Sequence, residues 1–260
     1  IAGGHGWFQL YPPQDEEIND DLLKRAKRSG LEVLMVTVDV PARGWRPRDM
    51  YNGLSLPPRV TAASVYHAAC RPRWSFATLA SGIPHFKTMG RYSKDKSFRG
   101  MADFIRQELG KPVTRERLKH IRGKWKGPLV IKGIMHPTDA EAAVKMGYDG
   151  ILVSNHGGRQ LDACRSPVEV LADIITQVDG RATIMIDSGF SNGLDIARGI
   201  ALGADFVFCG RAFMWGVSVL GQKGPEHVIN LLSNELQLAL TQIGCPSVNE
   251  LNTSWLDAKT

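Results

Sequence analysis

The chain has 260 residues, 43% of them hydrophobic and 22% charged, with a formal net charge of +6. This composition suits one globular domain or one α/β barrel, and no apolar run approaches the roughly 20 residues of a membrane span. The four cysteines are widely spaced without a C-x-x-C pair, which predicts neither a disulfide framework nor a metal site. This cysteine usage fits a reducing, cytoplasmic location. The chain starts at Ile1 without signal-peptide features, and we expect this to be a cut end.

The positive charge is concentrated in one segment. Residues 59–100 carry eight basic residues against Asp95 alone, a balance of +7 that exceeds the net charge of the whole chain. The aromatic residues of this segment lie among prolines and glycines in no recognisable nucleic-acid-binding module, so nucleic acid is not the expected partner. The remaining interpretations are a solvated loop, an anionic membrane surface or an acidic partner.

Taken in order, short apolar runs alternate with segments of helical periodicity. The runs predict strands at residues 7–11, 33–39, 129–133, 150–153, 183–187 and 206–209. The periodic segments predict helices at residues 18–30, 101–109, 115–125, 139–146, 167–178, 194–202 and 226–243. Residues 41–100, rich in Pro and Gly, are expected to form a long loop.

This alternation predicts an α/β fold with a parallel sheet wrapped by helices. Polar or charged residues, or a Gly-Arg pair, follow each predicted strand, and in a (β/α)₈ TIM barrel all such strand ends converge on the face that holds the active site. Six strands are two short of a closed barrel. The expectation is therefore a single domain over residues 1–260, a (β/α)₈ barrel lacking about its first two strands, with a basic loop insert at about 59–110.

The stretch from Ser154 to Asp162 follows the fourth predicted strand and combines unusual residue types. His156 can exchange a proton near neutral pH, and Arg159 can bind a carboxylate through two parallel hydrogen bonds. Gly157 and Gly158 let a ligand approach the backbone closely. A lone histidine after a strand is more often a loop or core residue, but this combination indicates an active site.

An ordered set of motifs resembles the FMN-dependent α-hydroxy-acid oxidizing enzymes over essentially the whole chain. The motifs are Trp7-Phe8-Gln9-Leu10-Tyr11, Thr37-Val38-Asp39-Val40-Pro41 with Arg46, Ile131-Lys132-Gly133, the Ser154–Asp162 stretch, Asp187-Ser188-Gly189, Gly203-Ala204 and Gly210-Arg211. Ser188, Arg46-Pro47-Arg48-Asp49 and Pro72-Arg73-Trp74 most resemble the bacterial quinone-linked L-lactate and (S)-mandelate dehydrogenases. The part of the family's barrel that precedes these motifs has no counterpart in this sequence.

The resemblance implies catalytic and substrate-binding roles. His156 would remove a proton from the substrate, Asp39 would stabilise the imidazolium, and Tyr11 would hydrogen-bond the substrate. Arg46 and Arg159 would bind the substrate carboxylate.

The resemblance also implies contacts with FMN. Lys132 would lie beside the flavin ring and stabilise its anionic reduced form. The other expected FMN-binding residues are Gln9, Thr37, Ser154, Asp187, Ser188, Gly189, Gly210 and Arg211. Ser191 stands where the family usually has a phosphate-binding arginine, which predicts weaker FMN retention or compensation from Asn192 or the glycine-loop amides.

The implied function is oxidation of an (S)-2-hydroxy acid, with L-lactate favoured, to the 2-oxo acid, with electrons passing to a membrane quinone. Alternatives are an (S)-mandelate dehydrogenase, an oxygen-using 2-hydroxy-acid oxidase, or a catalytically silent flavin-binding fragment. The resemblance further implies a homotetramer. The basic segment suggests a peripheral position on the inner face of the cell membrane.

Overall fold

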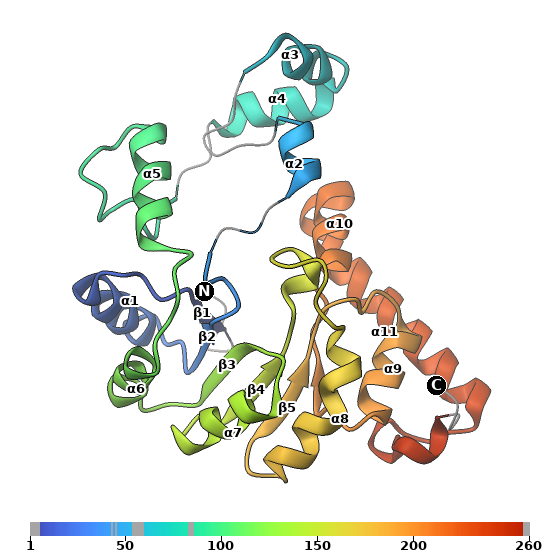
Figure 1. The fold of residues 1–260 in the computed structure, drawn as a ribbon. Helices are drawn as coiled ribbons and strands as arrows, with labels where there is room; N and C mark the ends of the chain where they lie inside the picture. Colours follow the sequence, from blue (N-terminus) through green and yellow to red (C-terminus); the bar gives the residue numbers. More distant parts are fainter. Residues whose placement is uncertain (1–5, 43, 45, 54–59, 83–85, 257–260) are drawn as a thin grey trace.

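The computed structural model describes residues 6–42, 44, 46–53, 60–82 and 86–256, which form one parallel sheet flanked by helices (Figure 1). The strands pair in chain order: β1 (Trp7–Leu10), β2 (Val33–Thr37), β3 (Leu129–Ile134), β4 (Gly150–Val153), β5 (Thr183–Ile186) and β6 (Phe206–Val207). Consecutive parallel strands joined by helices are the arrangement of a (β/α)₈ barrel. The fold is six strands of such a barrel, as the sequence predicted.

Helices cover the outer side of the sheet, while a second group extends beyond the strand ends. The covering helices are α1 (Glu16–Arg28), α6 (Arg115–Lys124), α7 (Pro137–Lys145), α8 (Pro167–Val178), α9 (Gly193–Ala201) and α11 (Gly224–Ile243). The second group lies toward the top of Figure 1 and comprises α2 (Pro47–Tyr51), α3 (Ala62–Ala69), α4 (Pro72–Ser81) and α5 (Phe98–Glu108). Helix α10 (Arg211–Leu220) leads from β6 into α11.

The two faces of the sheet form separate apolar cores because side chains alternate along each strand. Leu34, Ile131 and Ile151 belong to the large core under the outer helices. Their neighbours Met35, Val130, Leu152 and Met185 form a smaller cluster on the inner face. Two residues further along each strand, the inner face changes from apolar to polar, at Thr37, Lys132, Ser154 and Asp187. The strand pattern therefore directs these four side chains into the barrel interior.

The sheet is open between β6 and β1, but its two edges approach each other. Within the described ranges, neither edge strand pairs with the other. The rings of Trp7 in β1 and Phe208 after β6 lie 5.6 Å apart in an edge-to-face contact, and Phe208 also contacts Phe206. Trp7 and Phe206 are about half exposed, so this aromatic cluster borders the open side of the barrel.

The prediction of a long loop over residues 41–100, and of a basic loop insert at about 59–110, was wrong. This region contains α2, α3, α4 and the start of α5. Helices α3 and α4 bury no residue, so no apolar stripe marks them in the sequence. Local signals stabilise them instead: Thr61 and Ser64 form a capping box on α3, and Pro72 occupies the first turn of α4.

Smaller differences concern element boundaries. The first, second, fifth and sixth strands end earlier than predicted, so Tyr11, Asp39, Asp187 and Cys209 lie in the loops that follow. Helix α10 was not predicted, because its sequence continues an apolar run from β6. No helix in the described part of the chain has the length and apolar character needed to cross a membrane.

The packing of α9 against α11 depends on a glycine. A β-carbon at Gly193 would lie 2.1 Å from the backbone nitrogen of Leu236, whereas one at Gly123 in α6 would meet nothing within 4 Å. Gly193→Ala should therefore destabilise the fold by about 1–3 kcal/mol through overpacking. The control Gly123→Ala should stabilise it by up to about 1 kcal/mol through helix propensity. Urea unfolding measures both changes, and equal effects would contradict this packing.

Candidate functional site

The predicted site residues converge at the carboxyl ends of the strands, and Lys132 of β3 lies at their centre. Its side chain is only 10% exposed. The ammonium donates to Ser154 Oγ and to Asp187 Oδ2, the latter at 2.8 Å, and lies 3.9 Å from Asp39 Oδ2. One buried cation on β3 thus contacts the polar residues that follow three other strands, β2, β4 and β5.

His156 and Asp39 form a hydrogen-bonded pair beside this lysine. His156 Nδ1 lies 3.0 Å from Asp39 Oδ1. An ionised carboxylate can only accept, so Nδ1 carries the hydrogen and Nε2 is left as the acceptor of the ring. Asp39 is 90% buried. This is the geometry in which a carboxylate orients an imidazole and stabilises its protonated form.

The close approach of Asp39 requires a glycine in β3. Gly133 has φ +105°, and a β-carbon there would lie 2.5 Å from Cβ of Asp39. The register of β3 against β4 shifts between Lys132 and Ile134, on either side of this glycine. In the sequence Gly133 is recognisable only as part of a motif, because its role depends on a contact with the loop after β2 that residue spacing alone does not reveal.

The turn after β4 has a strained backbone. His156, Gly157 and Gly158 have φ values of +57°, +68° and +74°, in the left-handed region that a residue such as histidine rarely adopts. Hydrogen bonds hold this turn: the His156 amide donates to Ser154 Oγ at 3.2 Å, and the Gly158 amide to Asn155 Oδ1 at 3.2 Å. Strain of this kind persists only where surrounding contacts enforce it.

Tyr11 and Gln9 extend the site along the first strand. The Tyr11 ring lies 6.5 Å from that of His156. Burial, followed by the negative charge of Asp39, raises the pKa of Tyr11, so the phenol stays protonated at neutral pH and can donate a hydrogen bond. Gln9 Nε2 donates to Thr37 Oγ1 at 2.9 Å.

Two arginines converge on one carboxylate at the rim of the site. Asp49 Oδ2 lies 3.9 Å from the Arg46 guanidinium and 3.5 Å from that of Arg159. Arg46 Nε also donates to the backbone oxygen of Arg159 at 3.4 Å. Both arginine side chains are partly exposed, and their convergence shows that a carboxylate fits between them.

A second group of residues can receive an anion. Gly189, with φ +98°, and Gly210 both have open space where a side chain would lie. Gly210 precedes α10 without a side-chain cap, and the Arg211 guanidinium reaches the β4 loop beside Gly157. A helix amino terminus with free amides and an adjacent arginine suits a phosphate group.

The amino terminus of α9 is less open to an anion. Ser191 donates to Asp195 Oδ2 through both its amide and its hydroxyl. Asn192 Oδ1 caps the helix by accepting from the Asp195 amide at 2.8 Å, and the Gly193 amide donates to Glu235 at 2.8 Å. The Asn192 side chain is therefore engaged in capping α9, which disfavours its compensating for the arginine replaced by Ser191.

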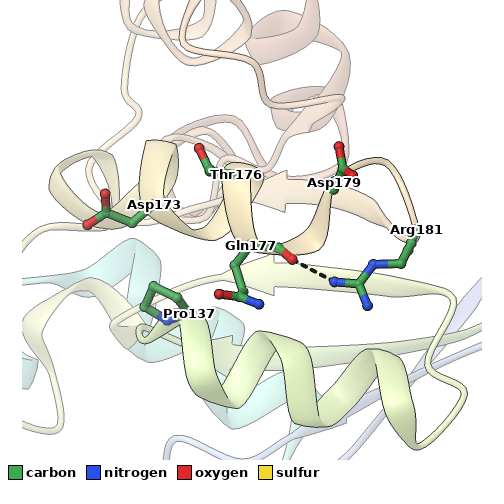
Figure 2. Close-up of a pocket in the computed structure, with 6 residues that line it drawn as sticks. All are labelled: Pro137, Asp173, Thr176, Gln177, Asp179 and Arg181. Carbon is green, nitrogen blue, oxygen red and sulfur yellow. Dashed lines mark hydrogen bonds between the residues drawn. The ribbon is translucent and has the colours of Figure 1, made fainter.

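A hollow of about 520 Å³ elsewhere on the surface lies between the outer helices α7 and α8. Figure 2 shows its lining, Pro137, Asp173, Thr176, Gln177, Asp179 and Arg181. None of these residues is among the predicted site residues, and Arg181 is bound to Gln177 O and Glu141. This hollow is separate from the predicted site. No cluster of metal-ligating side chains occurs among the described residues.

Fold and site together define a class: a β/α-barrel protein with an acid–base pair, a buried lysine and anion-binding groups at its strand ends. A family model described as FMN-dependent dehydrogenase matches residues 1–258, and the chain belongs to this family. The family's cofactor is FMN, and the residues present fit it. Gly189, Gly210 and Arg211 suit its phosphate, and the buried Lys132 suits the edge of a ring that becomes anionic on reduction.

Curated relatives and solved structures agree with this assignment. The chain is 38% identical to the L-lactate dehydrogenase of Pectobacterium atrosepticum and 40% identical to that of Acinetobacter baumannii, each over 257 residues and 96% of this chain. The crystal structure of the monotopic membrane protein (S)-mandelate dehydrogenase superposes with a TM-score of 0.91 at 34% identity, again over 96% of this chain. A mandelate oxidase structure gives a TM-score of 0.74 at 37% identity over 95% of this chain.

The chain spans about two thirds of the length of the relatives it matches. It covers 65% and 66% of the two L-lactate dehydrogenases, 66% of the mandelate dehydrogenase and 62% of the mandelate oxidase.

Removing the Lys132 charge tests the electrostatics of the site. Lys132→Met leaves Asp39 and Asp187 largely buried without their ammonium, which should destabilise the fold by about 3 kcal/mol in urea unfolding at neutral pH. The control Lys145→Met breaks an exposed pair with Glu141 and should cost less than about 1 kcal/mol. In an Asp187→Asn background, Lys132→Met should lower the free energy of unfolding by less than it does in the wild-type protein. An undiminished cost would contradict the charge pairing.

Proposed function

We propose that the chain carries the catalytic site of an FMN-dependent dehydrogenase that oxidises an (S)-2-hydroxy acid to the 2-oxo acid, with L-lactate as the favoured substrate. The observation that carries this proposal is the His156–Asp39 pair, held beside Lys132 and within the same strand-end face as Arg46 and Arg159. The named L-lactate dehydrogenases at 38% and 40% identity support the choice of substrate.

In this proposal each residue of the site has a separate role in the reaction. Arg46 and Arg159 bind the substrate carboxylate in the position that Asp49 approaches. His156 takes a proton through Nε2, and Asp39 stabilises the resulting imidazolium. Tyr11, neutral at working pH, donates a hydrogen bond to the substrate.

FMN, when bound, accepts the two electrons that the substrate loses. Lys132 would contribute a fixed positive charge beside the flavin ring, and Asp187, which is bound to the Lys132 ammonium, would hold the ribityl hydroxyls. Gln9, Thr37 and Ser154 would supply further hydrogen-bonding groups. Gly189, Gly210 and Arg211 would hold the phosphate.

Flavin bleaching tests the catalytic assignment. The protein loaded with FMN should lose its visible flavin absorbance on anaerobic addition of L-lactate. His156→Gln should slow this bleaching by about 10²–10⁴-fold, the usual contribution of a general base, while FMN affinity stays unchanged. The control His227→Gln, at an exposed position in α11, should bleach at the wild-type rate.

The outcomes separate the alternatives. Bleaching of His156→Gln at the wild-type rate would refute the base assignment. Faster bleaching by (S)-mandelate would favour the activity named for the similar solved structures. Peroxide formation in air would indicate an oxidase. Bound flavin that neither acid bleaches would identify a silent flavin-binding chain.

We further propose that the helical hairpin, residues 60–82, docks on an anionic membrane surface, where a quinone accepts the electrons. The hairpin exposes large apolar side chains, Val60, Val65, Tyr66, Trp74, Phe76 and Leu79. Arg71 and Arg73 lie on the same hairpin, while Arg59 falls outside the described residues. Apolar side chains insert at the headgroup boundary and basic ones are attracted to anionic lipid. A location on the inner face of the cell membrane follows, and the homotetramer stays a prediction.

Vesicle co-sedimentation tests the docking surface. Trp74→Ser combined with Phe76→Ser should lower binding to phosphatidylglycerol-containing vesicles at least tenfold, because each side chain contributes about 1.5–3 kcal/mol when buried in the interface. Trp74 is 60% exposed and Trp215 in α10 is 62% exposed, so Trp215→Ser is the matched control and should leave binding unchanged. Equal losses from both sites would contradict docking through the hairpin.

A further inference from the structure

Ser188, in the loop after β5, has an unusual backbone conformation. Its φ is +74°, in the left-handed region that side chains other than glycine, asparagine and aspartate seldom adopt. The described residues contain three such non-glycine positions, His156, Asp179 and Ser188. Two of the three, His156 and Ser188, lie on loops that touch each other at the site. Ser188 and the proposed base, His156, therefore both have a left-handed backbone and lie on adjoining loops.

The Ser188 hydroxyl joins the two loops through a pair of hydrogen bonds. It donates to Asp187 Oδ1 at 2.8 Å and accepts from the Gly157 amide at 2.9 Å. The directions are fixed, because an ionised carboxylate only accepts and a backbone amide only donates. The hydroxyl thus uses its one hydrogen on Asp187 and a lone pair on the residue next to His156.

Both hydroxyls that hold the His156 turn are anchored on Lys132. Asp187, which orients Ser188, receives the Lys132 ammonium on its other oxygen at 2.8 Å. Ser154 also accepts from Lys132 and in turn accepts from the His156 amide. The His156 and Gly157 amides therefore donate to the hydroxyls of Ser154 and Ser188, respectively. Lys132 contacts Ser154 directly and is linked to Ser188 through Asp187. The His156 ring is held separately by Asp39.

We propose that Ser188 is a positioning residue: its hydroxyl fixes the left-handed His156–Gly157 turn and so keeps the His156 imidazole aligned with Asp39. The proposal rests on the proposed function, in which His156 is the base. It differs from the expectation that Ser188 serves FMN binding. Loss of the hydroxyl should slow proton removal without weakening the binding of FMN, held at Gly210 and Arg211, or of the acid, held at Arg46 and Arg159.

The test uses Ser188→Gly in the full chain, because glycine adopts φ +74° without strain and the change removes only the hydroxymethyl group. Two measurements are made: hydrogen exchange of the Gly157 amide by NMR without cofactor or substrate, and anaerobic flavin reduction by L-lactate. The Gly157 amide should exchange about 3- to 10-fold faster, the equivalent of one neutral hydrogen bond. The reduction rate should fall by a similar factor, with FMN affinity and half-saturating lactate within twofold of wild type.

Two further variants make the comparison specific. Ser188→Ala retains the β-carbon but not the hydroxyl and should show the same faster exchange. Ser218→Ala removes an exposed hydroxyl that bonds to Met214 O within α10, and should change neither measurement.

The remaining outcomes overturn the proposal. Unchanged Gly157 exchange with tenfold weaker FMN binding would make Ser188 a cofactor ligand. Unchanged exchange and unchanged reduction would show that the hydroxyl holds nothing, and faster exchange with an unchanged reduction rate would show that it does not position the base. If no 2-hydroxy acid reduces the wild-type flavin, the proposed function fails, whereas Gly157 exchange still decides whether Ser188 fixes the turn.

Discussion

The site depends on one buried ammonium. Lys132 of β3 lies between Asp39 and Asp187 and also bonds Ser154, so it connects the loops that follow β2, β4 and β5. Burying one cation with two carboxylates depends on hydrogen bonds that offset the loss of solvation. Asp187 accepts from Lys132 and Ser188, and Asp39 Oδ1 is bound to His156, whereas Asp39 Oδ2 has only the ammonium at 3.9 Å. Stability and proposed chemistry are therefore coupled: the charge that holds the loops together is also the one that would face the flavin.

Backbone geometry sets the distances that this charge network needs. Gly133 allows Asp39 to approach β3, and Gly157 and Gly158 allow the turn after β4 to reverse sharply. Gly189 and Gly210 keep the opposite side of the site open. The sheet supports all of these positions: Gly133 lies within β3, and the other glycines lie in the loops that follow β4, β5 and β6. The contacts among the charged side chains at the strand ends therefore depend on the close backbone approach that these glycines allow.

Short apolar runs and strand–helix order sufficed to predict the parallel sheet, because both are local signals of buried strands. The same logic placed Lys132, Asp39 and His156 on one face before their contacts were known. It failed for α3 and α4, which bury nothing and so lack an apolar stripe. It also gave no indication of Asp49 between the two arginines or of Ser188 on Gly157, since those contacts join residues about 110 and 31 positions apart.

The most direct test of the account is a crystal structure of this chain with FMN and an unreactive 2-oxo acid. The account predicts the flavin ring against Lys132, the phosphate at Gly210 and Arg211, and the acid's carboxylate between Arg46 and Arg159 with its reacting carbon beside His156 Nε2. A flavin bound away from Lys132, or an acid whose carboxylate contacts neither arginine, would contradict it.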